Sequence, residues 1–448
     1  MTVTAALVRE VIETSFREIP RAAVDRIERL IVDSVANCFM GYEVTGRQLA
    51  AYAVELGGPE EAVLVADGRR VPAETAAAVN AQVARDTDFE ETGPGLHAGP
   101  AMVHTALAVG QRVGASGADV LAAAAIGYEV NARFHHARRD GDIIRHHATC
   151  VAIVAGKLLG LGGEALNRAI GFSWELPTSD ILRSWPPQPK RVSRLGIGNL
   201  WVCRLGVQAA LLASHGYGGL PDELDFQSAD YDLRGIATPT GFAHTADELE
   251  LKPFPASRGC NGALELVGRI VRRESLRIDE IERITARLPS IYLDAHQFEP
   301  EPENYWEAIY STHWGITMQA MQVPPGRHWF TPERLGDARS RRLCAKVEIV
   351  EDPEATRARN EKRRGEMANT VEIEARGQVF TESILMRDVP GSARSPMTED
   401  VFRDKFLSLV EPGIGSGRAA TLYDALSEIE ALPNVRSLAP MMAPPVGG

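Results

Sequence analysis

ADVLAAAAIGYEVNARF, residues 118–134, identifies the first half of the chain as helical. Its apolar residues follow helical spacing, and alanine and glycine recur throughout it. Because small side chains let neighbouring helices approach closely, the stretch predicts a helix inside a tightly packed helical domain. The flanking sequence has the same character, and further helices are predicted over residues 19–41, 51–56, 73–84, 101–109, 146–161 and 200–214.

The pattern changes near Lys252, where apolar and polar residues begin to alternate. Strands are predicted around residues 284–288, 347–349 and 371–375, and the last continues through an Arg376–Gly377 turn to Val379. A helical pattern returns at Ser395. The predicted fold is mainly α with α+β character: a large all-helical domain formed by residues 1–250 and 395–448, and a smaller inserted α/β domain over residues 251–394. The tail MMAPPVGG, residues 441–448, is predicted to be disordered.

Composition excludes several classes of protein. A formal net charge of -12 over 448 residues argues against a nucleic-acid-binding surface. The five cysteines are scattered and form no CxxC pair, which indicates free thiols and neither a zinc nor an iron–sulfur site. No apolar run is long enough to span a membrane, and the N-terminus does not resemble a signal peptide. We therefore expect a cytoplasmic protein without a nucleic-acid or membrane partner.

A polar loop, DFEETGPGLHAGP at residues 88–100, carries the candidate chemistry. Carboxylates, a hydroxyl and an imidazole lie close together in it, and its glycines and proline forbid a continuous helix. Such a loop can direct several polar groups at one small ligand. The alternative is a solvated acidic loop that precedes a helix.

Several stretches resemble the MmgE/PrpD family. They are DSVAN (33–37), DFEET (88–92), SGADVLAAAAIGYEVNAR (116–133), AGKLLGL (155–161), GVQAALLASHGYGG (206–219), KPFPASRG (252–259) and SPMTEDVFRDKF (395–406). Together they extend over nearly the whole chain in the order found in the family. The resemblance implies a homodimer of large helical domains with inserted α/β lids, which acts without metal or organic cofactor on small di- or tricarboxylates.

The resemblance leaves four functions open. The first is a lyase of the hydro-lyase type that dehydrates a 2-methylcitrate-like acid. An epimerase of an imino- or amino-dicarboxylate, similar to iminodisuccinate epimerase, is the second. A decarboxylase of the cis-aconitate type is the third, and the last is a dimer that binds a carboxylate without catalysis.

The resemblance also assigns site residues. The family's Asp, Thr and His fall on Asp88, Thr92 and His97, a second His falls on His147 or its neighbour His146, and two family lysines correspond to Arg194 and Lys252. Trp314 replaces a tyrosine that is typical of the family, and Ser257 and Asn261 replace a cysteine and a histidine of its lid. The predicted catalytic residues are Asp88, His97, His147 and Lys252, and the predicted substrate-binding residues are Thr92, Arg194, His146 and Trp314.

These residue types suit one kind of chemistry. Removing a proton from a carbon next to a carboxylate builds negative charge on that carboxylate, so the reaction needs a base at the carbon and cations at the oxygens. Arg194 and Lys252 suit the second task. His97 and His147 suit the first, with Asp88 orienting a ring or moving a proton itself, and the division of acid and base roles stays open. The alternative to a catalytic role is that Lys252 is a solvated lysine in a linker.

Overall fold

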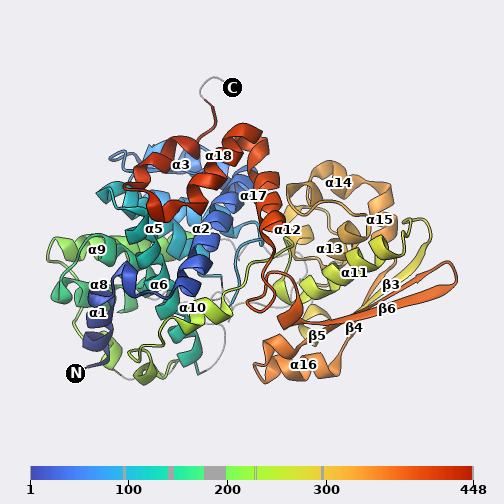
Figure 1. Ribbon diagram of the computed structural model, residues 1–448, viewed down its shortest axis with the longest axis horizontal. Helices are drawn as coiled ribbons and strands as arrows, with labels where there is room; N and C mark the ends of the chain where they lie inside the picture. Colours follow the sequence, from blue (N-terminus) through green and yellow to red (C-terminus); the bar gives the residue numbers. More distant parts are fainter. Residues whose placement is uncertain are drawn as a thin grey trace.

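The chain forms a large helical part and a smaller part built around a sheet, seen at the left and the right of Figure 1. The structure is a computed structural model that describes residues 2–93, 97–139, 146–175, 198–226, 228, 230–293 and 297–445. The helices of the first part are α1 (Val3–Glu13), α2 (Arg21–Gly41), α3 (Arg47–Leu56), α4 (Ala73–Arg85), α5 (Gly99–Val113), α6 (Gly117–Ala137), α7 (His146–Leu158), α8 (Gly163–Glu175), α9 (Gly198–Ser214) and α10 (Ala243–Glu248). The predicted helices are confirmed.

Small residues permit the close packing of this helical part. A Cβ atom added to Gly41 of α2 would lie 2.0 Å from the carbonyl oxygen of Val83 in α4. One added to Gly206 of α9 would lie 2.4 Å from the carbonyl oxygen of Ala148 in α7. Both distances are far below a van der Waals contact, so any larger residue would separate the helices. The helix pairs α2 with α4 and α7 with α9 therefore depend on small residues at their contacts.

A four-stranded mixed sheet forms the centre of the second part. Its order is β4 (Val347–Glu351), β3 (Ile281–Leu288), β5 (Ala368–Ala375) and β6 (Gln378–Leu385), and only the β3–β4 pair is parallel. The β5–β6 turn has positive φ at both Arg376 and Gly377, the backbone of a tight two-residue hairpin. The helices of this part are α11 (Asn261–Arg273), α12 (Tyr305–Tyr310), α13 (Thr312–Ala320), α14 (Pro332–Gly336), α15 (Ala338–Cys344) and α16 (Pro353–Asn360). The mixed fold class is thereby confirmed.

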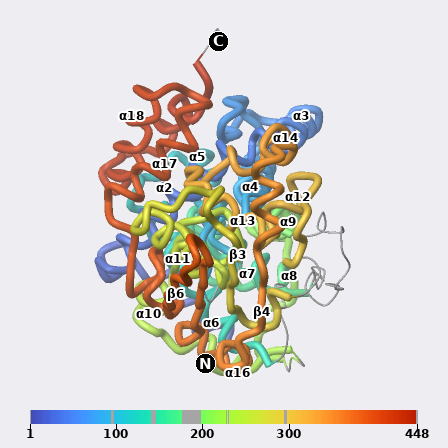
Figure 2. Tube along the Cα trace, turned by 90° about the vertical axis from the view of Figure 1, so that its right-hand side faces the viewer, coloured from blue at the N-terminus to red at the C-terminus, as the bar shows by residue number. Residues whose placement is uncertain are grey.

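The last helices return to the helical part. α17 (Glu399–Ile414) and α18 (Ser416–Ser427) pack on α2, and in Figure 2 they lie along one edge of the molecule, beside the sheet-containing part that faces the viewer. The prediction of a disordered tail is wrong for Met442, which is fully buried and accepts a hydrogen bond from the Ala66 amide at 2.9 Å. No described helix has the length and apolar character needed to cross a membrane. The five cysteines are free and buried.

Candidate active site

The loop between α4 and α5 is buried, which contradicts the alternative of a solvated acidic loop. Asp88, Glu90 and Glu91 expose 3%, 0% and 0% of their surfaces. Asp88 and His97 have positive φ angles, 43° and 65°, in a region that non-glycine residues rarely adopt. Such strain persists only where the surrounding structure enforces it, and it is concentrated at functional sites. Residues 94–96 lie outside the described part of the loop.

Two cations meet the carboxylates of this loop. Lys252, in the segment after α10, is fully buried, and its Nζ donates to Asp88 Oδ1 at 2.8 Å and to the Asp88 carbonyl at 2.9 Å. Arg85, at the end of α4, places Nη1 2.9 Å from Glu90 Oε1 and 3.4 Å from Asp88 Oδ1. Lys252 is therefore not a solvated linker residue. The sequence prediction missed Arg85, although its place three residues before Asp88 at a helix end was a usable signal.

His97 lies against the same carboxylate. Its Nδ1 is 2.7 Å from Glu90 Oε1, and its side chain is 27% exposed, more than any other group of the cluster. Burial raises the pKa of Glu90, but Arg85, Lys252 and His97 together outweigh it and hold this pKa well below its ordinary value. Burial, and then Arg85, lowers the pKa of His97. The favoured state at neutral pH is a neutral imidazole whose Nδ1–H faces an ionised carboxylate, which leaves Nε2 with a free lone pair.

Glu91 has the opposite charge state. Its Oε2 accepts the Gly99 amide at 2.9 Å, and its Oε1 lies 3.3 Å from the hydroxyl of Tyr128 in α6. Burial, followed by the nearby charge of Glu90, raises the pKa of Glu91 from 4.5 to about 8. A Cβ atom added to Gly99 would lie 2.4 Å from Glu91 Oε2, so a larger residue there would displace the Glu91 carboxyl from the Gly99 amide. Glu91 is thus a neutral acid that links the loop to α5 and α6.

The raised pKa of Glu91 predicts a pH-dependent stability. Because the folded state favours the protonated acid, this contribution is complete below about pH 4.5 and is lost as the pH rises to about 8. Glu91→Gln, a neutral isostere, is expected to match the wild type near pH 5. Near pH 8.5 its free energy of unfolding should exceed that of the wild type by about 1–3 kcal/mol, since one pKa unit corresponds to about 1.4 kcal/mol. Urea unfolding at the two pH values measures this difference, and equal pH dependence in both proteins would refute it.

Lys405 of α17 ties three segments together beneath the loop. Its Nζ donates to Asp33 Oδ1 of α2 at 2.6 Å, to the Phe89 carbonyl at 3.1 Å and to the Lys252 carbonyl at 2.9 Å. It also lies 3.7 Å from the centre of the Phe89 ring. The C-terminal helix therefore holds both the polar loop and the segment that carries Lys252. In the sequence, Lys405 stands on the apolar face of the predicted helix, a position that indicates a buried charge. The sequence prediction did not use this signal.

The sheet-containing part supplies two tyrosines to the same region. The hydroxyl of Tyr305 in α12 donates to the Asp86 carbonyl at 2.9 Å. Burial raises the pKa of Tyr310, with Arg85 opposing and Asp88 and Glu90 adding to the rise, so its hydroxyl stays protonated near these charges. The site is therefore shared between the two parts of the chain. The sequence YWEAIY, residues 305–310, contains no signal that predicts this contact.

Several buried polar atoms of the cluster lack a hydrogen-bond partner among the described residues. They are Asp88 Oδ2, both carboxylate oxygens of Glu90 and His97 Nδ1, although Glu90 Oε1 lies in ion-pair range of Arg85 and His97. A hydroxyl or an acid proton of a ligand would satisfy Asp88 Oδ2 and Glu90 Oε2. Asp88, Glu90 and His97 also place possible metal-ligand atoms within 4.8 Å of one another. Arg85 and Lys252 already oppose these carboxylates, so a divalent cation there would meet two buried positive charges.

The other predicted residues have different surroundings. His146 shares a hydrogen bond of 2.9 Å between its Nδ1 and the Tyr231 hydroxyl, stacks on Phe134 and lies 4.8 Å, ring to ring, from the buried His147. Thr92 pairs through its backbone with Glu250 at 2.9 and 2.8 Å, which fixes the loop beside the Lys252 segment. Arg194 lies outside the described residues.

Trp314 is part of the core of the sheet-containing domain. Its indole Nε1 donates to the Trp329 carbonyl at 2.8 Å, and 1% of its surface is exposed. Burial lowers the pKa of the neighbouring His313 to about 4. The structure brings together Asp88, His97, Lys252 and the backbone of Thr92. Their catalytic and binding roles, and those of His146, His147, Arg194 and Trp314, stay predictions.

Comparisons with known proteins extend over most of the chain. The model of the MmgE/PrpD N-terminal domain matches residues 5–228, and the model of the MmgE/PrpD C-terminal domain matches residues 254–429. The cis-aconitate decarboxylase-like protein oryM of Aspergillus oryzae is 22% identical over 97% of this chain and 96% of its own length. Cis-aconitate decarboxylase of Mus musculus is 24% identical over 94% of this chain and 89% of its own length. Cis-aconitate decarboxylase of Homo sapiens is 23% identical over 74% of this chain and 73% of its own length.

Proposed function

Because this chain belongs to the MmgE/PrpD family, we propose that it is a cofactor-independent lyase of small di- or tricarboxylates. The reaction is a proton transfer at a carbon next to a carboxylate. The observation that carries the proposal is the buried cluster of Asp88, Glu90, His97, Arg85 and Lys252 on a strained loop. The chain's own groups then supply both the base and the cations that this chemistry needs.

His97 is the base of the proposed mechanism. His97 Nδ1 lies 2.7 Å from Glu90, so Nε2 is the nitrogen that faces the substrate with its lone pair, and the lowered pKa keeps the ring neutral at pH 7. Lys252 and Arg85 pair with the carboxylates of Asp88 and Glu90, and with His97 they lower the pKa of Glu90 and so favour its ionised form. The substrate's own carboxylates require further cations, a role that we assign to Arg194 as the sequence predicted.

Dehydration of a 2-methylcitrate-like hydroxy acid is the form of the reaction that this charge state favours. His97 takes a proton from the carbon, the carbon–carbon double bond forms as the carbon–oxygen bond breaks, and the protonated His97 gives its proton to the leaving hydroxyl, which departs as water. A neutral imidazole is ready for the first of these steps. The buried oxygens Asp88 Oδ2 and Glu90 Oε2, which lack donors among the described residues, suit a substrate hydroxyl.

Decarboxylation of a cis-aconitate-like acid is the second candidate, and the names of the curated relatives favour it. In that reaction a carboxylate leaves as carbon dioxide, its electron pair returns to the carbon framework, and a proton is delivered to carbon. The ring that acts as a base in dehydration would act here as an acid. Binding of a polyanion next to His97 raises the imidazole pKa and so favours this role.

We propose for the whole protein a cytoplasmic homodimer that binds a small di- or tricarboxylate. An epimerase would use the same proton abstraction and return the proton to the opposite face. A non-catalytic dimer would bind the carboxylate without turnover. Both are outcomes of the substrate test below.

Proton NMR of the chelator-treated protein with a substrate panel tests the proposal. The panel contains citrate, 2-methylcitrate, cis-aconitate and iminodisuccinate. A new olefin with loss of hydroxyl establishes dehydration, whereas loss of carbon dioxide from cis-aconitate establishes decarboxylation. Inversion without elimination identifies an epimerase, and a folded protein that turns over none of the four would refute the proposal.

His97→Gln is expected to lower kcat about 100-fold, because general acid–base catalysis contributes on the order of 10²–10⁴. In the wild type, activity should fall on the acidic side as His97 gains a proton, at a pH below its ordinary pKa of 6.5. The pH profile of kcat/KM checks both points. His215→Ala, which removes an exposed histidine beyond α9, is the matched control and should keep full activity. Full activity in His97→Gln would exclude this residue as the base.

A further inference from the structure

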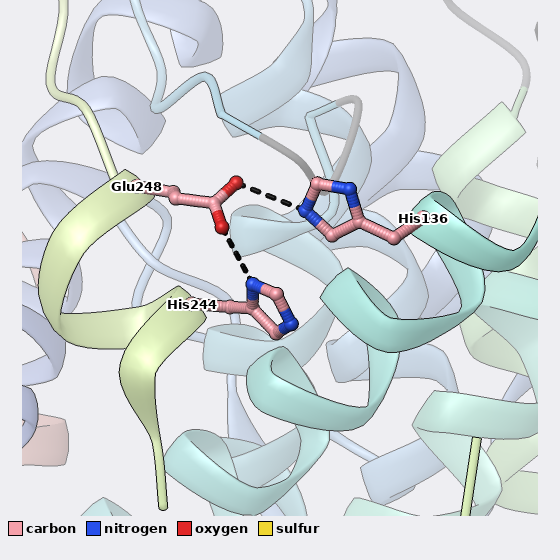
Figure 3. Close-up of side chains that lie close together, drawn as sticks. All are labelled: His136, His244 and Glu248. Carbon is pink, nitrogen blue, oxygen red and sulfur yellow. Dashed lines mark hydrogen bonds and ion pairs between the residues drawn. The ribbon is translucent and has the colours of Figure 1, made fainter. Parts of the chain in front are cut away.

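A second polar cluster lies at the surface, between α6 and α10. Figure 3 shows the rings of His136 and His244 turned toward the carboxylate of Glu248 from the two helices. His136 Nε2 is 3.0 Å from Glu248 Oε2, and His244 Nδ1 is 2.5 Å from Glu248 Oε1. The donor atoms of all three residues lie within 4.8 Å of one another. Two imidazole nitrogens and one carboxylate thus converge on one point.

We propose that His136, His244 and Glu248 bind a divalent transition-metal ion of the zinc class. Imidazole nitrogen and carboxylate oxygen bind Zn²⁺ at about 2.0–2.2 Å, and three protein ligands leave a fourth position for water. Two nitrogen ligands disfavour Mg²⁺ and Ca²⁺, which prefer oxygen. The side chains are 48%, 20% and 37% exposed, in that order, so an ion can reach them from solvent. This site is separate from the proposed reaction, which needs no metal.

The scaffold behind the three ligands is already fixed. Glu129 of α6, two turns before His136, accepts the Thr245 amide at 2.8 Å and the Thr245 hydroxyl at 2.7 Å. From α2, Arg26 donates to the Ala246 carbonyl at 3.3 Å. His244 and Glu248 are one turn apart on α10 and therefore share a face of this helix. Because both helices are held by contacts outside the cluster, an ion needs only small side-chain rotations to bind.

The cluster lies beside the segment that leads to the candidate active site. A Cβ atom added to Gly93 would lie 2.7 Å from the Glu248 carbonyl oxygen, so the polar loop touches the end of α10. Two residues later, Glu250 pairs with Thr92 through the backbone, and Lys252 follows. An ion that joins α6 to α10 therefore stabilises the start of the Lys252 segment. It contacts no residue of the cluster around Asp88.

Titration of the metal-stripped full-length protein with Co²⁺ tests the proposal. The expected result is one equivalent bound with the visible absorption of a four- or five-coordinate ion, displaced by Zn²⁺. His136→Ala and His244→Ala should each weaken binding at least about 100-fold, because loss of even a residue that only hydrogen-bonds to a metal ligand costs about 10–100-fold. Zn²⁺ should raise the thermal unfolding temperature of the wild type but not that of His136→Ala.

Two control variants locate the ion. His215→Ala should bind as the wild type does, and His97→Gln should too, because His97 belongs to the cluster around Asp88. His136 is largely exposed, so its replacement leaves the fold intact, and circular dichroism verifies this. Absence of binding by the wild type, or an equivalent that survives in His136→Ala and disappears in His97→Gln, would overturn the proposal. In either case the cluster is a hydrogen-bonded clamp without an ion.

Discussion

Lys252→Met is expected to lower kcat/KM by at least about 1000-fold. Lys252 is a preorganised donor among the carboxylates of the site, and removing one preorganised active-site donor costs on the order of 10²–10³ in kcat. Lys252 also holds Asp88 through two hydrogen bonds of 2.8 and 2.9 Å and lies 3.9 Å from Glu90. Without it, Arg85 is the one remaining cationic partner of the two buried carboxylates in the described cluster, beside the His97 ring that faces Glu90. Steady-state kinetics on the substrate identified by NMR measures the loss.

The variant also loses stability, and two controls separate that effect from catalysis. Removing one partner of a buried ion pair costs about 3–5 kcal/mol. The double variant Lys252→Met/Asp88→Asn should recover part of this stability but no activity. Lys157→Met removes a lysine that donates to the carbonyls of Val11, Ile12 and Thr14, and it should keep kcat. Wild-type kcat/KM in folded Lys252→Met would show that Lys252 is structural only.

Lys405→Met is expected to lower the free energy of unfolding by about 3–5 kcal/mol, the cost of leaving a buried charge unpaired. Asp33 exposes 2% of its surface. Its Oδ1 would lose the Lys405 Nζ donor at 2.6 Å, and its Oδ2 would keep the Asn37 Nδ2 donor at 3.0 Å. The carbonyls of Phe89 and Lys252 would lose a donor as well. Chemical unfolding at pH 7 measures the change.

The partner variant Asp33→Asn tests whether the loss arises from the pair. Burial raises the pKa of Asp33 and lowers that of Lys405, so each group alone would favour its neutral form. The double variant Lys405→Met/Asp33→Asn should therefore be more stable than Lys405→Met. If the loss of unfolding free energy in the double variant equals the sum of the losses in the two single variants, Asp33 and Lys405 do not act together.

Much of the fold could be predicted because its signals are local. The apolar spacing of residues 118–134 and the strand alternation at residues 371–375 report their own environments. The Arg376–Gly377 turn was found because few residues accept a positive φ. The buried Met442 was missed because its partner, Ala66, is far away in the sequence. The predicted domain boundaries at residues 251 and 395 stay a prediction.

The candidate site could be predicted only where one loop or a family resemblance marked it. Asp88, His97 and Lys252 meet in space, and the resemblance had assigned all three. Lys405 was missed because its importance arises from contacts with distant segments, whereas Arg85, which pairs with Asp88 and Glu90 only three and five residues further on, left a local signal that the prediction did not use. The dependence on distant segments also holds for His136 and His244, which are 108 positions apart and share one carboxylate only after folding.

Deuterium exchange followed by proton NMR tests the central claim, that His97 transfers a proton at a carbon next to a carboxylate. The wild type and His97→Gln are incubated in deuterium oxide with the substrate that the panel identifies. The account predicts deuterium at that carbon, in substrate or product, with the wild type, and an exchange rate about 100-fold lower with His97→Gln. Equal exchange by the two proteins, or wild-type exchange confined to other positions of the substrate, would contradict it.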